Sequence, residues 1–267
     1  MKVLGLSFVR NAEERLPAAL DSMAVYCDQI CVVDDRSTDR TGDILRAHPT
    51  VSNVFTVDPA LSNDPWYIPE STLLAMLYRM ADLCQPDWVV LLSADETIVP
   101  PENVRALLSD AGPDIAGFHL YLVSAWTDET YPFMVPLMGQ ARSQVGRIWR
   151  YRPGLAPSGK RLHNSYFPVN IKDGGRVEFC GDLVIDHAGW STLPERVAKV
   201  DLYTSLDPDL ELNSDVPYDI GLLFGFERHR IDDLVQEYER RLETIRRDPR
   251  SSTNNSRNPE ALLSFDV

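Results

Sequence analysis

The chain has 267 residues, 44% of them hydrophobic and 25% charged, which is enough to bury one sizeable core with an appended lobe. Its formal net charge of -14 argues against a nucleic-acid partner, because binding the phosphate backbone requires a basic face. No apolar stretch approaches the roughly 20 residues that span a bilayer, and the chain opens on a strand-like segment and not on a signal peptide. We therefore expect a cytoplasmic globular protein with no transmembrane segment.

Strand and helix patterns alternate along the first 124 residues. Apolar, β-branched runs predict strands at residues 3–9, 30–33, 54–57, 88–92 and 116–123. Helical spacing predicts helices at residues 13–25, 38–47 and 70–84, and after the pair Pro100-Pro101. Such alternation is typical of an α/β domain with a mostly parallel central sheet flanked by helices. The loop at residues 58–69 is long enough to form a flap over a cleft.

Two of these predicted strands end in adjacent acids. Residues 30–33 run into Asp34 and Asp35, and residues 88–92 are followed by Asp95 and Glu96. Open α/β sheets bind ligands at the carboxyl ends of their strands. We expect the two strands to lie side by side, so that Asp35, Asp95 and Glu96 surround one cleft. The alternative is that the acids cap or solvate two separate turns.

Hard divalent cations suit such a cleft. Mg²⁺ and Mn²⁺ use few protein carboxylates and complete their shells with phosphate oxygens and water. The two acidic strand ends therefore predict a nucleotide diphosphate together with its metal.

The pattern changes in the second half of the chain. Residues 125–212 have shorter strands, prolines and many Trp, Tyr, Arg and His residues, and we expect them to form an acceptor-binding half. In the remaining extension, residues 213–267, the apolar positions at residues 231–245 predict an amphipathic helix. This helix could pack on the domain or form a homodimer contact.

The four cysteines lie in or beside apolar segments, without the spacing of zinc or redox motifs. We expect reduced core thiols; pairing of Cys27 with Cys31 is the alternative, across a predicted helix-to-strand transition.

Three segments resemble the successive signatures of family 2 glycosyltransferases with the GT-A fold: residues 7–16, 33–41 and 92–96. A looser similarity, to transferases that modify lipopolysaccharide cores, continues through residues 147–154, 162–163 and 186–187. The resemblance implies that residues 1–124 are the nucleotide-sugar-binding half of a single GT-A (Rossmann-like) domain. It also implies a hexosyltransferase-type reaction that moves a sugar from a UDP- or GDP-sugar to a saccharide or other small-molecule acceptor, with Mn²⁺ or Mg²⁺.

The same resemblance suggests roles for single residues. Asp95 would hold the metal, Glu96 would assist it or orient the sugar, and His187 would complete the shell, as imidazole suits Mn²⁺ better than Mg²⁺. Asp35 would accept hydrogen bonds from the base or ribose. The other expected donor-binding residues are Ser7, Val9, Asn11, Glu13 and Ala94, although Glu13 could equally lie on a surface helix.

A locally basic stretch could meet the diphosphate or an anionic acceptor. It contains Arg147, Arg150, Arg152, Lys160 and Arg161, in an otherwise acidic chain. The alternative is a solvated hairpin. His163 could contact the acceptor or a phosphate.

The sequence departs from the family pattern at two places. Ser93 stands where the family usually has the first acid of Asp-x-Asp, and Asn164 stands where related transferases often have Glu after His. An inverting transfer needs a carboxylate base within reach of the acceptor, and Asp128 and Glu129 are the best candidates, followed by Glu178 and Asp182. If none reaches the acceptor, a retaining mechanism without a protein base becomes plausible.

Three other classes of protein share parts of this pattern. A haloacid-dehalogenase-type phosphatase would need Asp at alternate positions, but Ser37 follows Asp35 two places on. A sugar-phosphate nucleotidyltransferase would normally have a Gly-rich loop after the first strand, which this chain lacks. A non-catalytic module that binds a nucleotide sugar stays open because of Ser93 and Asn164.

Overall fold

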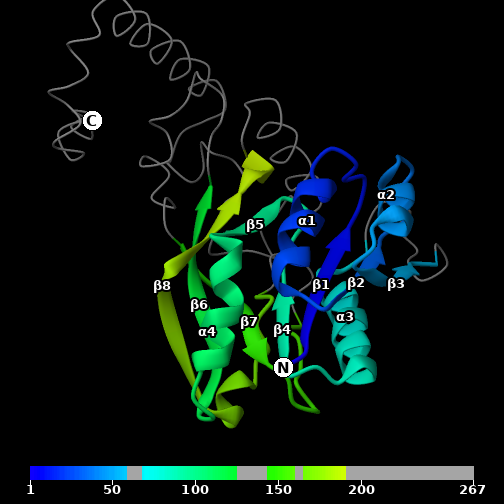
Figure 1. Ribbon diagram of the computed structural model, residues 1–267. Coiled ribbons are helices and arrows are strands. Elements are labelled where there is room, and N and C mark those ends of the chain that lie inside the picture. The colour runs from blue at the N-terminus through cyan, green and yellow to red at the C-terminus, as the bar shows by residue number, and fades with distance from the viewer. Residues whose placement is uncertain (59–67, 125–142, 160–164, 191–267) are drawn as a thin grey trace, which may run out of the picture. The chain divides into compact units, whose positions relative to one another are not determined.

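The structure is a computed structural model that describes residues 1–58, 68–124, 143–159 and 165–190 (Figure 1). The chain divides into two compact units, and nearly all described residues belong to the first, which comprises residues 1–123 and 143–187. The elements follow in the order β1 (Val3–Val9), α1 (Leu16–Tyr26), β2 (Gln29–Asp34), α2 (Thr41–Ala47), β3 (Val51–Thr56), α3 (Glu70–Cys84), β4 (Trp88–Leu91), β5 (Glu96–Val99), η2 (Pro101–Asn103), α4 (Val104–Asp110), β6 (Ile115–Ser124), β7 (Ser143–Arg150), η3 (Ile171–Gly174), β8 (Arg176–His187) and η4 (Ala188–Trp190).

In the described part of the chain, eight strands form one sheet in the order β3-β2-β1-β4-β7-β6-β8-β5. The strands β3, β2, β1 and β4 are parallel, whereas β7 runs antiparallel to β4 and β6, and β5 runs antiparallel to β8. The predicted α/β fold with a mostly parallel central sheet is confirmed. The antiparallel part was not predicted from the sequence.

One prediction about the sheet was wrong. The strands that lead to Asp35 and to Asp95 are not neighbours, because β1 lies between β2 and β4 and pairs with both. Their carboxyl ends still meet at the same edge, since Leu6 of β1 is level with Cys31 of β2 and with Leu91 of β4. The turn after β1 therefore separates the two acidic ends.

Alternation along the parallel strands feeds two apolar cores. In β4, Trp88 and Val90 join the core that contains α1 and α4, while Val89 and Leu91 join the core that contains α3. Successive side chains of a strand point to opposite faces, so a strand covered on both faces is apolar throughout. Gly5 leaves room for the Met23 side chain of α1, because a Cβ there would lie 2.6 Å from Met23 Cε.

Most predicted boundaries are within a few residues of those observed, and α3 spans the predicted residues 70–84. Residues 96–99, for which no element was predicted, form β5, which pairs with β8. Three predicted regions lie wholly or partly outside the described residues. They are the flap at residues 59–67, the acceptor-binding half at residues 125–142, 160–164 and 191–212, and the whole extension at residues 213–267 with its amphipathic helix.

Candidate functional site

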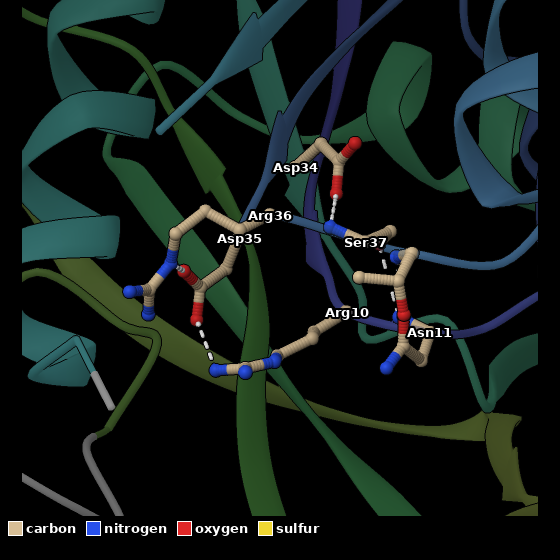
Figure 2. Close-up of polar contacts among 7 residues, drawn as sticks. Arg10, Asn11, Asp34, Asp35, Arg36 and Ser37 are labelled. Carbon is tan, nitrogen blue, oxygen red and sulfur yellow. Dashed lines mark hydrogen bonds and ion pairs between the residues drawn. The ribbon is translucent and has the colours of Figure 1, made fainter. Parts of the chain in front are cut away.

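The carboxyl end of β2 holds two buried acids with different surroundings (Figure 2). Asp34 Oδ1 accepts a hydrogen bond from the backbone N–H of Ser37 at 3.0 Å, so this acid closes the turn. Asp35 accepts from Arg36 Nε at 2.7 Å and from Arg10 Nη1 at 3.4 Å, and the two guanidinium groups approach it from different sides. Arg36 has a positive φ of 58°, which turns the chain sharply after Asp35. Asp35 is thus a carboxylate held in place by cations at the binding edge of the sheet.

The turn after β1 is tied to the turn after β2. Asn11, also at a positive φ, donates its backbone N–H to Ser37 Oγ at 3.0 Å, and its Oδ1 accepts from the backbone N–H of Thr38 at 2.8 Å. Glu13 Oε2 accepts from the backbone N–H of Arg40 at 2.9 Å and from its Nε at 3.1 Å. These contacts make the two turns one unit, and they account for Asn11 and Glu13 without a ligand.

Two further predicted donor-binding residues lie on β1 below this unit. Ser7 and Val9 are 2% and 3% exposed, and the carbonyl of Val9 accepts the backbone N–H of Asp35 at 2.8 Å. Val9 thus holds the backbone of Asp35 in place. Contact of a nucleoside with Ser7, Val9, Asn11 or Glu13 stays a prediction.

The second acidic end brings a carboxylate and an imidazole together. In the pairing of β5 with β8, Glu96 lies opposite His187, and this register places His187 Nε2 3.4 Å from Asp95 Oδ2. Both side chains are mostly buried, with 15% and 17% exposed. Two of the three predicted metal ligands therefore meet, although they are 92 positions apart in the sequence.

Glu96, the third predicted ligand, is 2% exposed and bound on both oxygens. Arg147 Nη2 donates to Oε1 at 2.8 Å and Arg147 Nε donates to Oε2 at 3.0 Å. The backbone N–H of Ser93 also donates to Oε2, at 3.1 Å. This bidentate pair fixes the turn that carries Asp95, and it gives Glu96 a role that requires no metal.

Tyr166, which is half-buried, completes this cluster. Its hydroxyl lies 2.9 Å from Ser93 Oγ, and the guanidinium carbon of Arg147 lies 4.1 Å from the centre of its ring. The carbonyl of Tyr166 accepts from Tyr78 Oη on α3 at 2.9 Å. Tyr166 follows no motif, so sequence reasoning missed it; only its place in an aromatic-rich segment gave any signal.

Burial and charge set the ionisation of the cluster. Burial raises the pKa of Tyr166 well above its ordinary value, so its hydroxyl stays protonated. Burial lowers the pKa of Arg147, but the charge and hydrogen bonds of Glu96 outweigh this effect and raise it overall. Ser93, in the position of the missing acid, thus lies against a neutral phenol whose ring faces the guanidinium of Arg147.

The rest of the basic stretch turns inward where it is described. Arg150 donates to the carbonyls of Ile115 and Gly112 at 3.1 Å and stacks over Trp88, with 4.3 Å between the guanidinium carbon and the ring centre. Arg152 donates to the carbonyl of Asn170. These arginines join segments of the fold, which differs from the alternative of a solvated hairpin, and contact of the stretch with a diphosphate or an anionic acceptor stays a prediction.

Several of the predicted site residues belong to segments that the structure does not describe. Asp128, Glu129, Lys160, Arg161 and His163 lie outside the described residues. Of the remaining candidates, Ala94 is half-buried beside Asp95, Asp182 is exposed, and Glu178 forms an exposed ion pair with Arg176.

Asp95 and His187 offer oxygen and nitrogen ligands that fit Mn²⁺ or Mg²⁺. Within the described ranges, no three His, Cys, Asp or Glu side chains gather into one metal-binding group.

The strand order and the acidic ends at one edge agree with the expected GT-A-type α/β domain. No protein-family model matches the chain. Uncharacterised proteins of Mycobacterium tuberculosis and Mycobacterium bovis are each 45% identical to it over 242 residues. The match covers 91% of this chain, which spans 60% of the length of these curated relatives.

Several solved structures are also similar. A mycobacterial protein has a TM-score of 0.48 and 15% identity, over 80% of this chain and 76% of its own. S. aureus TarS 1-349 in complex with UDP has a TM-score of 0.46 and 13% identity, over 80% and 67%. Glucosyl-3-phosphoglycerate synthase from M. tuberculosis with Mn²⁺, UDP and phosphoglyceric acid has a TM-score of 0.46 and 16% identity, over 80% of each chain.

No helix in the described part of the chain is long and apolar enough to cross a bilayer.

Proposed function

We propose that this chain is a metal-dependent glycosyltransferase of the family 2 type, which transfers a sugar from a nucleotide-diphosphate sugar to a saccharide or other small-molecule acceptor. The meeting of Asp95 with His187, at the sheet edge that also carries Asp35, is the observation that carries the proposal. Two acidic strand ends, one of them supplied with an imidazole, suit a ligand that has a nucleoside at one end and a metal-bound diphosphate at the other.

Asp95 and His187 would hold Mn²⁺ or Mg²⁺. When bound, the metal would act as a Lewis acid that neutralises the charge developing on the leaving nucleoside diphosphate. Asp35 would accept hydrogen bonds from the base or ribose, in exchange for one of its present contacts with Arg10 or Arg36. The longer contact, 3.4 Å to Arg10 Nη1, is the one we expect a ligand to displace.

Glu96 and Arg147 would act through the turn that they hold. Both Glu96 oxygens are occupied by Arg147 and Ser93, and the Ser93–Glu96 contact closes the turn around Asp95. We therefore assign Glu96 and Arg147 to positioning Asp95. Direct metal binding by Glu96 and direct diphosphate binding by Arg147 stay predictions.

The acceptor half of the reaction rests on residues that the structure does not describe. We propose Glu129 or Asp128 as the base that takes the acceptor proton, in an inverting transfer. Replacement of Glu129 by Gln should slow transfer while leaving donor binding intact. A normal transfer rate in that variant, with Asp128→Asn also normal, would remove both from the role.

A ligand panel tests the function directly. The full chain is heated with UDP, GDP, UDP-sugars or GDP-sugars, with Mn²⁺ present or chelated, and donor hydrolysis is followed under the same conditions. We expect metal-dependent stabilisation by one nucleotide and slow metal-dependent hydrolysis of its sugar. Stabilisation without any turnover, with or without an acceptor, would favour the non-catalytic module, and phosphate release from simple phosphomonoesters would favour the phosphatase.

Asp95→Asn is the decisive variant, with Asp43→Asn as its control. Asp43 is an acid on α2 whose side chain is 73% exposed, so its loss removes the same charge away from the site. Asp95→Asn should abolish the metal-dependent signals while unfolding at nearly the same temperature as the parent protein. Unchanged hydrolysis in Asp95→Asn, or an equal loss in Asp43→Asn, would contradict the metal role.

A further inference from the structure

Two cysteines that are distant in sequence are in contact inside the fold. Cys31 lies on β2 and Cys84 is the last residue of α3, 53 positions later, and their Sγ atoms are 3.9 Å apart. The sequence made Cys27 the alternative partner of Cys31. The structure instead brings Cys31 against Cys84, because Cys31 points into the core beneath α3 while Cys27 belongs to the core on the other face.

The two thiols differ in access to solvent. Cys31 is fully buried, whereas Cys84 is partly exposed at the end of its helix. A reagent in solution would therefore meet Cys84 first, and Cys31 would be reached only through Cys84. Such an arrangement suits an attacking thiol followed by a resolving thiol.

Polar groups lie beside the buried sulfur. Asn53 Nδ2 donates to Cys31 Sγ at 3.7 Å, and Ser52 Oγ lies 3.7 Å from the same sulfur. Burial raises the pKa of the Cys31 thiol, and hydrogen bonds from Ser52 and Asn53 counter part of that effect. These groups stabilise the thiolate that the second step requires.

We propose that Cys31 and Cys84 form a modification site, a dithiol that a low-molecular-weight disulfide oxidises to an intramolecular disulfide. The Cys84 thiolate attacks one sulfur of the reagent, forms a mixed disulfide and releases one thiolate. Cys31 then gives up its proton and attacks the sulfur of Cys84, which breaks the mixed bond and releases the second thiolate. The protein loses two electrons and two protons, and the reagent is reduced to two thiols.

The bond requires only a small movement. A disulfide is about 2 Å long, so the sulfurs must approach by about 2 Å more, within the reach of side-chain rotation and a small shift at the helix end. Closure would join α3 to the strand that leads to Asp34 and Asp35. This site does not depend on the proposed transferase activity.

Oxidised glutathione tests the proposal on the full chain. The folded protein is treated with it, freed of reagent and unfolded, and its remaining thiols are counted and mapped by mass spectrometry. We expect two of the four thiols to be lost and a peptide containing Cys31 to be joined to one containing Cys84. Four intact thiols, glutathione retained on Cys84, or Cys31 joined to Cys27 would each overturn the proposal.

Matched variants sharpen the result. Replacing Cys27 and Cys180 together by Ala should leave the cross-link unchanged, because neither belongs to the pair. Cys84→Ser should leave Cys31 as a free thiol under the same treatment. If Cys31 is oxidised as readily in Cys84→Ser as in the parent chain, Cys84 does not mediate the reaction.

Discussion

Removal of either member of the Glu96–Arg147 pair should cost much of the stability of the protein. The two side chains are 3% and 10% exposed, and two hydrogen bonds of 2.8 and 3.0 Å join them. Loss of one partner leaves an uncompensated buried charge, which typically costs about 3–5 kcal/mol. A domain is stable by only about 5–15 kcal/mol in total, so we expect Arg147→Met and Glu96→Gln each to lower the urea midpoint sharply.

The double variant measures the interaction between Glu96 and Arg147 apart from the contacts that each makes with other residues. With both changes in one chain no buried charge is left unpaired, so the total loss should be smaller than the sum of the single losses by about 1–3 kcal/mol. Unfolding is measured in urea with a chelator present, so that no metal contributes to the coupling. The free energies of unfolding are compared by linear extrapolation at a common slope.

An exposed pair on α2 provides the control. Arg46 and Asp43 are 70% and 73% exposed, and exposed pairs contribute at most about 1 kcal/mol. Arg46→Met should therefore have a small effect. Losses at Glu96 and Arg147 that add to within about 0.5 kcal/mol, or that are no larger than at Arg46, would refute the reasoning.

Three further predictions concern other groups of the fold. Ser93→Ala should cost about 0.5–1.5 kcal/mol, because it removes the partly buried hydrogen bond between Ser93 and the Tyr166 hydroxyl. Adding Tyr166→Phe should recover part of this loss in urea unfolding, and strict additivity of the two changes would contradict the prediction. Burial raises the pKa of Asp28, but hydrogen bonds from the Val3 backbone and from Arg105 outweigh burial and lower this pKa overall. The ionised Asp28 therefore stabilises the fold fully above its unfolded pKa of about 3.9, and this stabilisation is lost as the pH falls through the lower pKa of the folded state. The difference in unfolding temperature between the parent chain and Asp28→Asn should shrink over that acid range, and a constant difference would contradict the assignment. His187→Ala should reduce activation by Mn²⁺ more than by Mg²⁺ in the donor hydrolysis assay, and equal losses would remove the imidazole from the metal shell.

The sequence by itself determined the individual strands and helices of this protein. The apolar runs before Asp35 and Asp95 specify buried strands, and a strand that ends on an acid places that acid at the edge of the sheet. The helical spacing of residues 70–84 likewise specified α3, because the periodicity of a helix is written in consecutive residues.

Tertiary structure decided which of these residues meet. The insertion of β1 between β2 and β4 separates the two acidic ends, and no local pattern encodes the order of strands. The pairing of β5 with β8 brings His187 to Asp95, and the pairing of β4 with β7 brings the strand of Arg147 beside the acidic turn. Glu96 reads as a metal ligand from its neighbours in sequence, yet its carboxylate lies against a guanidinium 51 positions away. A buried charge must be compensated, but only the packed fold determines which group compensates it.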